Sequence, residues 1–320
     1  MLDQTSLKDQ EDVLLRLEER LGRLYARQRL GIEQEHEGQV FGGGINFFHI
    51  ENWYSIHSLI KIALKASGLY WRGVTNTAKI QLQHHYVSDP LVPETFRGFT
   101  ILQLSDLHCD ICPLAVQRLT EIVRELKYDL CVLTGDYRGR TYGPYDAALA
   151  GLARIRAELS GPVYGVLGNH DTVRMVPVME DMGIRMLLNE SVAIPRGGQR
   201  MHLAGIDDAH FYRVENIEKA ASAIPYDEFS ILLSHTPEVY HQAAHAGFNV
   251  MLSGHTHGGQ ICLPGGIPIE LNAVVPRRMG AGAWRHCSMI GYTSVGAGAS
   301  AVTVRFNCSP EITLHHLEAV

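Results

Sequence analysis

The sequence contains no run of about 18 uncharged apolar residues, the length that an α-helix needs to cross a bilayer. It has no excess of basic residues either: 28 lysines and arginines are outnumbered by 34 aspartates and glutamates, and the net charge is −6. No nucleic-acid partner is therefore expected. Residues 1–12 lack both the basic start and the apolar stretch of a secretory signal, so we expect a cytoplasmic protein.

Cysteine is scarce and forms no recognisable metal-binding pattern. Among 6 cysteines, only Cys109 and Cys112 have the CxxC spacing, and no second pair accompanies them. Thiols of cytoplasmic proteins stay reduced. We therefore expect free thiols, buried or half-buried, rather than a redox or zinc function.

Histidine, by contrast, is abundant, with 17 residues. Many of these histidines stand beside aspartate, asparagine or glycine in five short motifs: Asp106-Leu107-His108, Gly135-Asp136, Gly168-Asn169-His170-Asp171, Ser234-His235 and Gly254-His255-Thr256-His257-Gly258-Gly259-Gln260. Four other histidines, His84, His85, His315 and His316, fall outside these motifs.

From Phe99 onward, short apolar runs alternate with amphipathic stretches, which predicts a layered α/β domain over residues 99–320. The predicted strands are Phe99–Leu104, Leu130–Thr134, Val163–Leu167, Met201–Ile206, Ile231–Ser234, Val250–Ser253, Met289–Thr293, Val302–Phe306 and Ile312–His315. The predicted helices are Leu114–Leu126, Tyr145–Leu159, Val214–Ala223 and Glu238–Ala244.

Each motif begins where one of these predicted strands ends. Asp106, Asp136 and Asn169 follow the first three strands, and His235 and His255 follow two later ones. Ligands of open α/β sheets bind at the carboxyl ends of the strands. We therefore expect these side chains to meet at one rim of the domain.

The residue types in the motifs suit a pair of divalent metal ions. A carboxylate can bridge two ions, and imidazoles, carboxylates and an amide oxygen can complete their coordination; this mixture favours manganese, iron or zinc over calcium. Two ions about 3.5–4 Å apart can clamp the attacking and leaving oxygens of a phosphate ester, and a water shared by them becomes a nucleophile near neutral pH. The sequence therefore predicts a two-metal site that breaks phosphate esters.

The series of motifs from Asp106 to Gln260 resembles the calcineurin-like metallophosphoesterase superfamily, in the order and spacing of that family. The tail from Val295 to Leu314 also resembles a bacterial branch that contains UDP-diacylglucosamine pyrophosphatases and related phosphodiesterases, which are often membrane-associated. The resemblance implies a four-layer α/β/β/α sandwich. Residues 1–98 would then be an N-terminal helical extension.

The resemblance also implies a role for each motif residue. Carried over by position, the first ion is held by Asp106, His108 and His257, the second by Asn169, His235 and His255, and Asp136 bridges the two. His170 would protonate the leaving oxygen, with Asp171 orienting it. The family usually has a short aliphatic residue and a glycine after the bridging aspartate, whereas this chain has Tyr137 and Arg138. Tyr137 and Arg138 could line the substrate pocket, or Tyr137 could pack on the next helix.

Two helices are expected in the N-terminal extension. Leucines recur at three- and four-residue steps over residues 9–30, which predicts a helix that packs on the core or forms a short pairing surface. Residues 31–50 are polar and glycine-rich, which predicts a flexible connection. The stretch 51–72 combines a broad apolar arc, aromatic ends and a basic face from Trp53 to Arg72. It could lie in the membrane interface or pack against the catalytic domain.

These features leave three functional hypotheses. The first is a phosphodiesterase or pyrophosphatase that acts on a lipid-linked substrate at the inner face of the membrane, with residues 51–72 in contact with that membrane. The second is a phosphodiesterase for a soluble substrate such as a cyclic nucleotide. The third is a metal-stabilised interaction module with little turnover.

Overall fold

The computed structural model describes residues 4–41 and 54–319, and its centre is a pair of six-stranded sheets. The first sheet has the order β1 (Gln81–Asp89), β14 (Glu311–Ala319), β2 (Thr100–Leu104), β3 (Leu130–Thr134), β4 (Val163–Val166) and β5 (Ile184–Met186). The second has the order β12 (Gly282–His286), β13 (Met289–Thr293), β9 (Val250–Ser253), β8 (Ser230–Leu233), β7 (Gln199–Gly205) and β6 (Glu190–Arg196). A two-stranded hairpin consists of β10 (Cys262–Leu263) and β11 (Ile267–Pro268).

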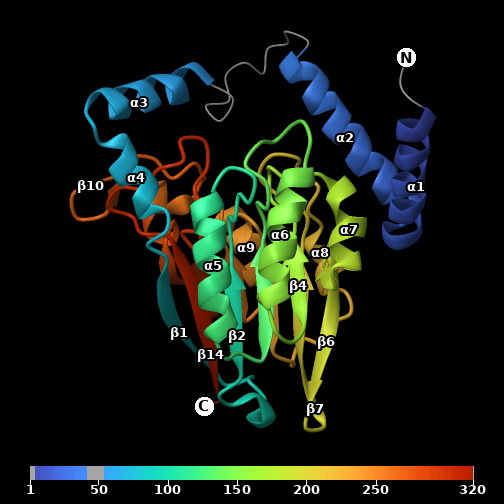
Figure 1. Ribbon diagram of the computed structural model, residues 1–320. Helices are drawn as coiled ribbons and strands as arrows, with labels where there is room; N and C mark the ends of the chain where they lie inside the picture. Colours follow the sequence, from blue (N-terminus) through green and yellow to red (C-terminus); the bar gives the residue numbers. More distant parts are fainter. Residues whose placement is uncertain (1–3, 42–53, 320) are drawn as a thin grey trace.

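Helices cover the outer face of each sheet (Figure 1). The first sheet is covered by α5 (Pro113–Glu125), α6 (Asp146–Glu158) and α7 (Val176–Asp181), and the second by α8 (Ile217–Ala221) and α9 (Tyr240–His245). Single 3₁₀ turns occur at Glu94–Phe96, Val173–Met175, Pro237–Val239, His257–Gly259 and Arg277–Met279.

Alternation of side chains along the strands explains the four layers. Leu102 of β2 packs toward the helices, while its neighbour Ile101 packs between the two sheets. In the second sheet Ile231 faces the inter-sheet core and Leu232 faces α8 and α9. Both faces of each sheet are therefore apolar, as the nearly continuous hydrophobic runs predicted. The expected α/β/β/α sandwich is confirmed.

Of the elements predicted after residue 99, one is absent and one is shorter, and the structure adds α7, β5, β6 and β12, which were not predicted. The segment Val302–Phe306 is not a strand; it is irregular, and its one ladder contact is a bridge between Phe306 and Ile261. The reason is Arg305, which is fully buried next to buried Val304, so burial does not alternate along the segment as it would in a strand. Its guanidinium donates to backbone carbonyls. The helix predicted over Val214–Ala223 is shorter because Asn216 caps it, accepting a hydrogen bond from Lys219 N.

The first sheet also contains a strand from the segment that the sequence assigned to the helical extension. β1 pairs in parallel with β14, from Gln81 opposite Glu311 to Asp89 opposite Ala319. This pairing brings together four of the histidines that lie outside the motifs, with His84 Nδ1 2.9 Å from His316 Nε2 and His85 Nδ1 2.9 Å from His315 Nδ1.

The N-terminal helices α1 (Gln4–Leu21) and α2 (Arg23–Phe41) are separated at Gly22, whose φ is +85°. The single helix predicted over 9–30 is therefore two helices. The flexible connection predicted over 31–50 is wrong as far as Phe41, and residues 42–53 lie outside the described residues. Leu17 is fully buried in the core beneath α5, α6 and α7, so the prediction of a helix packed on the core is confirmed.

A buried arginine joins α2 to the two-sheet domain. Arg29 is fully buried; its Nε donates to Asp207 Oδ2 at 3.0 Å, and its Nη1 lies 2.7 Å from Glu33 Oε1. Glu33 in turn accepts hydrogen bonds from Thr172 Oγ1 at 2.5 Å and from Val173 N at 2.7 Å. The second helix therefore holds the loop that follows β4.

The amphipathic stretch forms two helices, α3 (Tyr54–Ala66) and α4 (Tyr70–Asn76), at the end of the molecule where the loops around β10 also lie (Figure 1). Large apolar side chains remain outside the core: Leu59 is 66% exposed, Ile62 63% and Trp71 72%. The alternative in which the whole apolar face packs on the catalytic domain is therefore wrong for these residues. Within residues 4–41 and 54–319, no helix combines the length and apolarity needed to cross a membrane.

The buried arginine generates a stability prediction. Arg29→Met keeps most of the side-chain length but leaves Asp207 buried without its cation and Glu33 with only Arg174, so we expect it to lower the free energy of unfolding by about 3–5 kcal/mol. Urea denaturation followed by circular dichroism would measure the change. Arg27→Met is the control, because Arg27 is 54% exposed and its ion pair with Glu18 should contribute less than about 1 kcal/mol. Equal losses in the two variants would contradict the prediction.

Candidate metal centre

The loops after β2, β3, β4, β8 and β9 bring the predicted ligands to one rim of the sandwich. All seven predicted metal-binding side chains are buried: Asp106, His108, Asp136, Asn169, His235, His255 and His257. Burial of so many titratable groups in one place requires that their charges and lone pairs satisfy one another or an ion.

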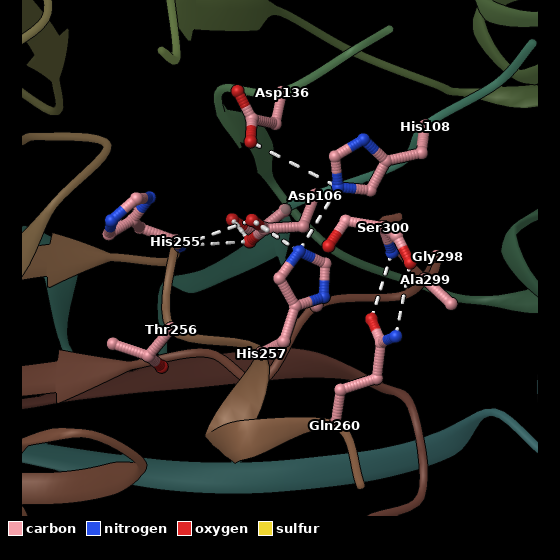
Figure 2. Close-up of polar contacts among 12 residues, drawn as sticks. Asp106, His108, Asp136, His255, Thr256, His257, Gln260, Gly298, Ala299 and Ser300 are labelled. Atoms are coloured by element: carbon pink, nitrogen blue, oxygen red, sulfur yellow. Dashed lines mark hydrogen bonds and ion pairs between the residues drawn. The ribbon is translucent and has the colours of Figure 1, made fainter. Parts of the chain in front are cut away.

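One group of ligand atoms consists of Asp106, His108 and His257. The Nε2 atoms of the two histidines lie 3.0 Å apart, and His257 Nε2 is 3.4 Å from Asp106 Oδ1. Figure 2 shows the two imidazoles and the Asp106 carboxylate directed toward a common point.

A second group consists of Asp136, His235 and His255, with Asn169 beside it. His235 Nε2 is 3.3 Å from Asp136 Oδ2, 3.2 Å from His255 Nδ1 and 2.9 Å from Asn169 Oδ1. Asp136 Oδ2 is also 4.0 Å from His108 Nε2 of the first group. The Asp136 carboxylate therefore lies between the two groups.

Backbone carbonyls fix the protonation of three of these imidazoles. Each contact joins one ring nitrogen to a carbonyl oxygen at 2.8 Å: His108 Nδ1 to Arg138 O, His235 Nδ1 to Thr134 O, and His255 Nε2 to Asn272 O. A carbonyl can only accept, so these ring nitrogens carry protons and donate. The opposite nitrogen of each ring is the one that faces the centre, which is the arrangement typical of metal-binding histidines.

The donor set fits a pair of divalent metal ions. Two imidazole nitrogens about 2.0–2.1 Å from one tetrahedral ion lie roughly 3.3 Å apart, close to the separations in both groups. Burial raises the pKa of the Asp106 carboxyl to about 6 and lowers the pKa of His108 to about 4. The protein alone therefore stabilises these charges poorly, and cations would relieve that cost.

The backbone at the centre is strained. Positive φ angles, unusual for residues other than glycine, occur at five ligand positions: Asp106, His108, Asp136, His255 and His257. Glycines permit the close approach of the loops. A Cβ on Gly168 would lie 2.2 Å from Asp136 Oδ1, and one on Gly254 would lie 2.4 Å from Asp106 Oδ2. The loops can therefore approach the two carboxylates this closely only because these two positions carry no side chain.

His170 lies at the edge of the centre. Asp171 was expected to orient this histidine, but its carboxylate has other partners. The ring Nδ1 of His170 is 2.8 Å from Thr141 Oγ1, and its Nε2 is 3.9 Å from Asp136 Oδ2. The Asp171 carboxylate instead accepts backbone hydrogen bonds from Asp136 N, Tyr137 N and Gly168 N, at 2.8, 2.9 and 2.8 Å. Asp171 therefore holds the loops after β3 and β4 together.

The two residues that depart from the family pattern have different surroundings. Tyr137 is fully buried among the helices of the first layer and donates to Val166 O at 2.9 Å, so the packed alternative is correct. Arg138 is also buried; its guanidinium donates to the carbonyl oxygens of His170, Thr141 and Gly143. Arg138 therefore fixes the loop that presents Thr141 to His170.

Two contributors to the centre were missed by the sequence reasoning. Thr141 belongs to none of the five motifs, and Arg305 lies in a segment that was predicted as a strand. The guanidinium of Arg305 donates to Val295 O at 2.6 Å, Gly298 O at 2.7 Å and His257 O at 3.3 Å. It joins the loop after β13 to the His257 backbone, and no sequence signal marks so distant a contact.

An open cleft of about 1050 Å³ lies over the centre. Its lining includes Asp136, His170, His255 and His257 at the centre. The surrounding wall comes from α3 and α4, from residues 111–114 at the start of α5, and from the loops at 259–261, 269–272 and 300–303. Both cysteines of the CxxC pair are free and buried, as expected for this pair, and burial raises the pKa of the Cys112 thiol to about 11.

Comparisons with known proteins agree with this geometry. The family model for calcineurin-like phosphoesterase matches residues 99–259. The sequence is 30% identical over 231 residues to the uncharacterized metallophosphoesterase YkoQ of Bacillus subtilis (strain 168), covering 69% of this chain and 84% of that protein. It is 30% identical over 268 residues to the uncharacterized metallophosphoesterase YkuE of the same organism, covering 80% and 92%. It is 28% identical over 233 residues to the phosphodiesterase YaeI of Escherichia coli (strain K12), covering 68% and 82%.

Metal binding should release protons. Burial alone would lower the pKa of His235, but the Asp136 carboxylate outweighs it and raises that pKa to about 10 in the metal-free protein. At pH 7 His235 Nε2 therefore holds a proton that a metal ion must displace. The release of this one proton should raise the metal affinity by up to about tenfold for each unit of increase in pH.

Isothermal titration calorimetry in buffers of different ionisation enthalpy would count the protons released. His235→Asn should reduce the count, whereas His84→Asn, outside the centre, should not. Metal binding without proton release at pH 7 would contradict the assignment of His235 as a ligand that is protonated in the metal-free protein.

Proposed function

Because the chain belongs to the calcineurin-like phosphoesterase family and is therefore a metal-dependent hydrolase, we propose that it cleaves a phosphodiester or pyrophosphate bond at a pair of metal ions. One observation carries the proposal: the Asp136 carboxylate lies between two groups of buried ligands, 3.3 Å from His235 Nε2 and 4.0 Å from His108 Nε2. Family membership also argues against an interaction module without turnover.

The proposed ligand sets follow the two groups of side chains. One ion would be held by Asp106, His108 and His257, the other by Asn169, His235 and His255, with Asp136 shared. Manganese, iron or zinc would suit this mixture of nitrogen and oxygen donors. When bound, such a pair polarises the phosphate and makes a water acidic enough to serve as nucleophile near neutral pH.

His170 is proposed to donate a proton to the leaving oxygen. Its side chain is 17% exposed and lines the cleft, whereas the metal-binding side chains lie deeper. The Thr141 hydroxyl can donate to Nδ1, which would leave the proton of the neutral ring on Nε2, the nitrogen nearer the Asp136 carboxylate. An acid placed at the mouth of the site can reach the oxygen that departs into the cleft.

Asp171 and Arg138 are proposed as positioning residues. The Asp171 carboxylate holds the backbone of Asp136, and the Arg138 guanidinium holds the carbonyls of His170 and Thr141. Their work is to fix the loops on which the shared carboxylate and the proton donor stand.

A lipid-linked substrate is the finer proposal. The cleft is far larger than a phosphodiester group, and Ile60 and Val74 of α3 and α4 form part of its wall beside Lys61. On the same helices Ile62 and Trp71 are exposed to solvent. Exposed apolar side chains next to a basic group suit contact with an anionic membrane surface, and a substrate held there could reach the cleft directly. The protein would then be cytoplasmic and associated with the inner face of the membrane.

The role of His170 can be tested through the leaving group. His170→Ala should keep its metals yet lose about 10²–10⁴-fold in kcat with an alkyl phosphodiester, whose leaving oxygen needs a proton. With bis(para-nitrophenyl) phosphate the loss should be much smaller. Asp136→Asn is the contrast, because it should lose metal and turnover together for both substrates. Equal losses with the two leaving groups in His170→Ala would contradict the general-acid role.

The lipid-linked substrate makes a separate prediction. Replacement of both Ile62 and Trp71 by serine should abolish co-sedimentation with anionic vesicles, while activity on a soluble diester stays unchanged. Turnover of a nucleotide-linked lipid in vesicles should fall at least about tenfold. Leu24→Ser, at an 84% exposed leucine on α2, is the matched control and should change neither. If the unaltered protein does not bind these vesicles, a soluble substrate such as a cyclic nucleotide becomes the better hypothesis.

A further inference from the structure

Three histidines outside the catalytic centre lie together on the surface of the second sheet. His241 and His245 belong to α9, and His286 is the last residue of β12. One ring nitrogen from each histidine lies within 4.8 Å of the others. The ring centroids are 4.6 Å apart for His241 and His286, and 6.5 Å apart for His245 and His286.

The packing of α9 on β12 sets this arrangement. Side chains four residues apart lie on one flank of a helix, which places His241 beside His245. Alternate residues of a strand share a face, which places His286 beside Trp284. Tyr240 packs edge-on against both, with centroids 6.2 Å from Trp284 and 4.8 Å from His286. Trp284 is itself buried, so the three histidines stand on a fixed base.

The strand register places this cluster at the far end of the sheet from the catalytic centre. Gly282, the first residue of β12, pairs with Thr293, which pairs with Ser253 just before the His255 motif. His286 pairs with Met289, at the opposite end of β13. The three histidines therefore cannot share an ion with the centre at the carboxyl ends of β8 and β9.

Nothing else in the described part of the chain occupies these imidazoles. Across residues 4–41 and 54–319, their ring nitrogens make no hydrogen bond or ion pair; the rings contact other aromatic rings, and Arg278 is near enough to His286 to contribute to its lowered pKa. Neutral imidazoles therefore present free lone pairs. Because His241 and His245 are exposed, rotation of their side chains can bring the nitrogens to the roughly 3.3 Å separation that a shared tetrahedral ion requires.

We propose that His241, His245 and His286 form a separate binding site for a divalent transition-metal ion, best fitted by zinc. Three imidazoles and a water complete a tetrahedral zinc site. The absence of a carboxylate from the group disfavours magnesium and calcium, which prefer oxygen ligands. The ion would link α9 to β12, the edge strand of the second sheet.

Metal content measured on the whole chain tests the proposal. Unaltered protein, His241→Gln, His245→Gln, His286→Gln and the triple variant would be dialysed against the same buffered Zn²⁺ solution and analysed by mass spectrometry for zinc per chain. The catalytic centre is common to all of them, so the difference isolates the second site. We expect each variant to hold one zinc ion fewer than the unaltered protein. Gln242→Ala, at an exposed position of the same helix, should match the unaltered protein.

A second readout separates metal loss from misfolding. Phosphodiesterase activity should be the same in all the variants, because the cluster is remote from the catalytic centre. Zinc should raise the Tm of the unaltered protein more than that of His286→Gln, because only the former gains a link between α9 and β12. Equal zinc content in the unaltered protein and the active triple variant would overturn the proposal.

Discussion

Two carboxylates buried among imidazoles are the constraint around which this molecule is organised. Asp106 and Asp136 are almost without solvent, and burying an ion without adequate compensation costs several kcal/mol. Without metal, the protonated ring of His235 compensates Asp136, whereas the rings of His108 and His257 compensate little because burial lowers the pKa of both. A pair of cations would satisfy the carboxylates and the ring lone pairs at once, so the catalytic requirement and the electrostatic one have the same solution.

Such a centre can exist only on a rigid base. Left-handed backbone at Asp136 and His255 is unfavourable, and it persists because neighbouring groups hold it. The Asp171 carboxylate accepts hydrogen bonds from the loops after β3 and β4, and the Arg305 guanidinium gathers the carbonyls near His257. The two sheets supply the fixed strand ends from which those loops start. Burial of apolar side chains in the three largest core clusters thus offsets the cost of the unfavourable backbone and the buried charges at the centre.

The sequence predicted the parts of the protein whose signals are local. Apolar runs that end in glycine or polar residues located the strands before Asp106 and His255, and the polar residues that follow those strands lie together in the structure. Long-range features left no such signal. Asp171 is next to His170 in sequence, yet the turn directs its carboxylate to the loop after β3. β1 has a few scattered apolar residues, among them exposed Leu82 and Tyr86, and it pairs with a strand from the other end of the chain, so no long apolar run marks it in the sequence.

The pairing of β1 with β14 has a consequence for any shortened form of this protein. A chain that began at Phe99 would contain every metal-binding residue, but it would leave the 9 residues of β14 as a bare edge. Their free amide and carbonyl groups would offer a template to the same strand of another molecule. By pairing with β14, the segment before Phe99 covers an edge through which the first sheets of two molecules could otherwise join. This role is separate from any contribution of the segment to catalysis.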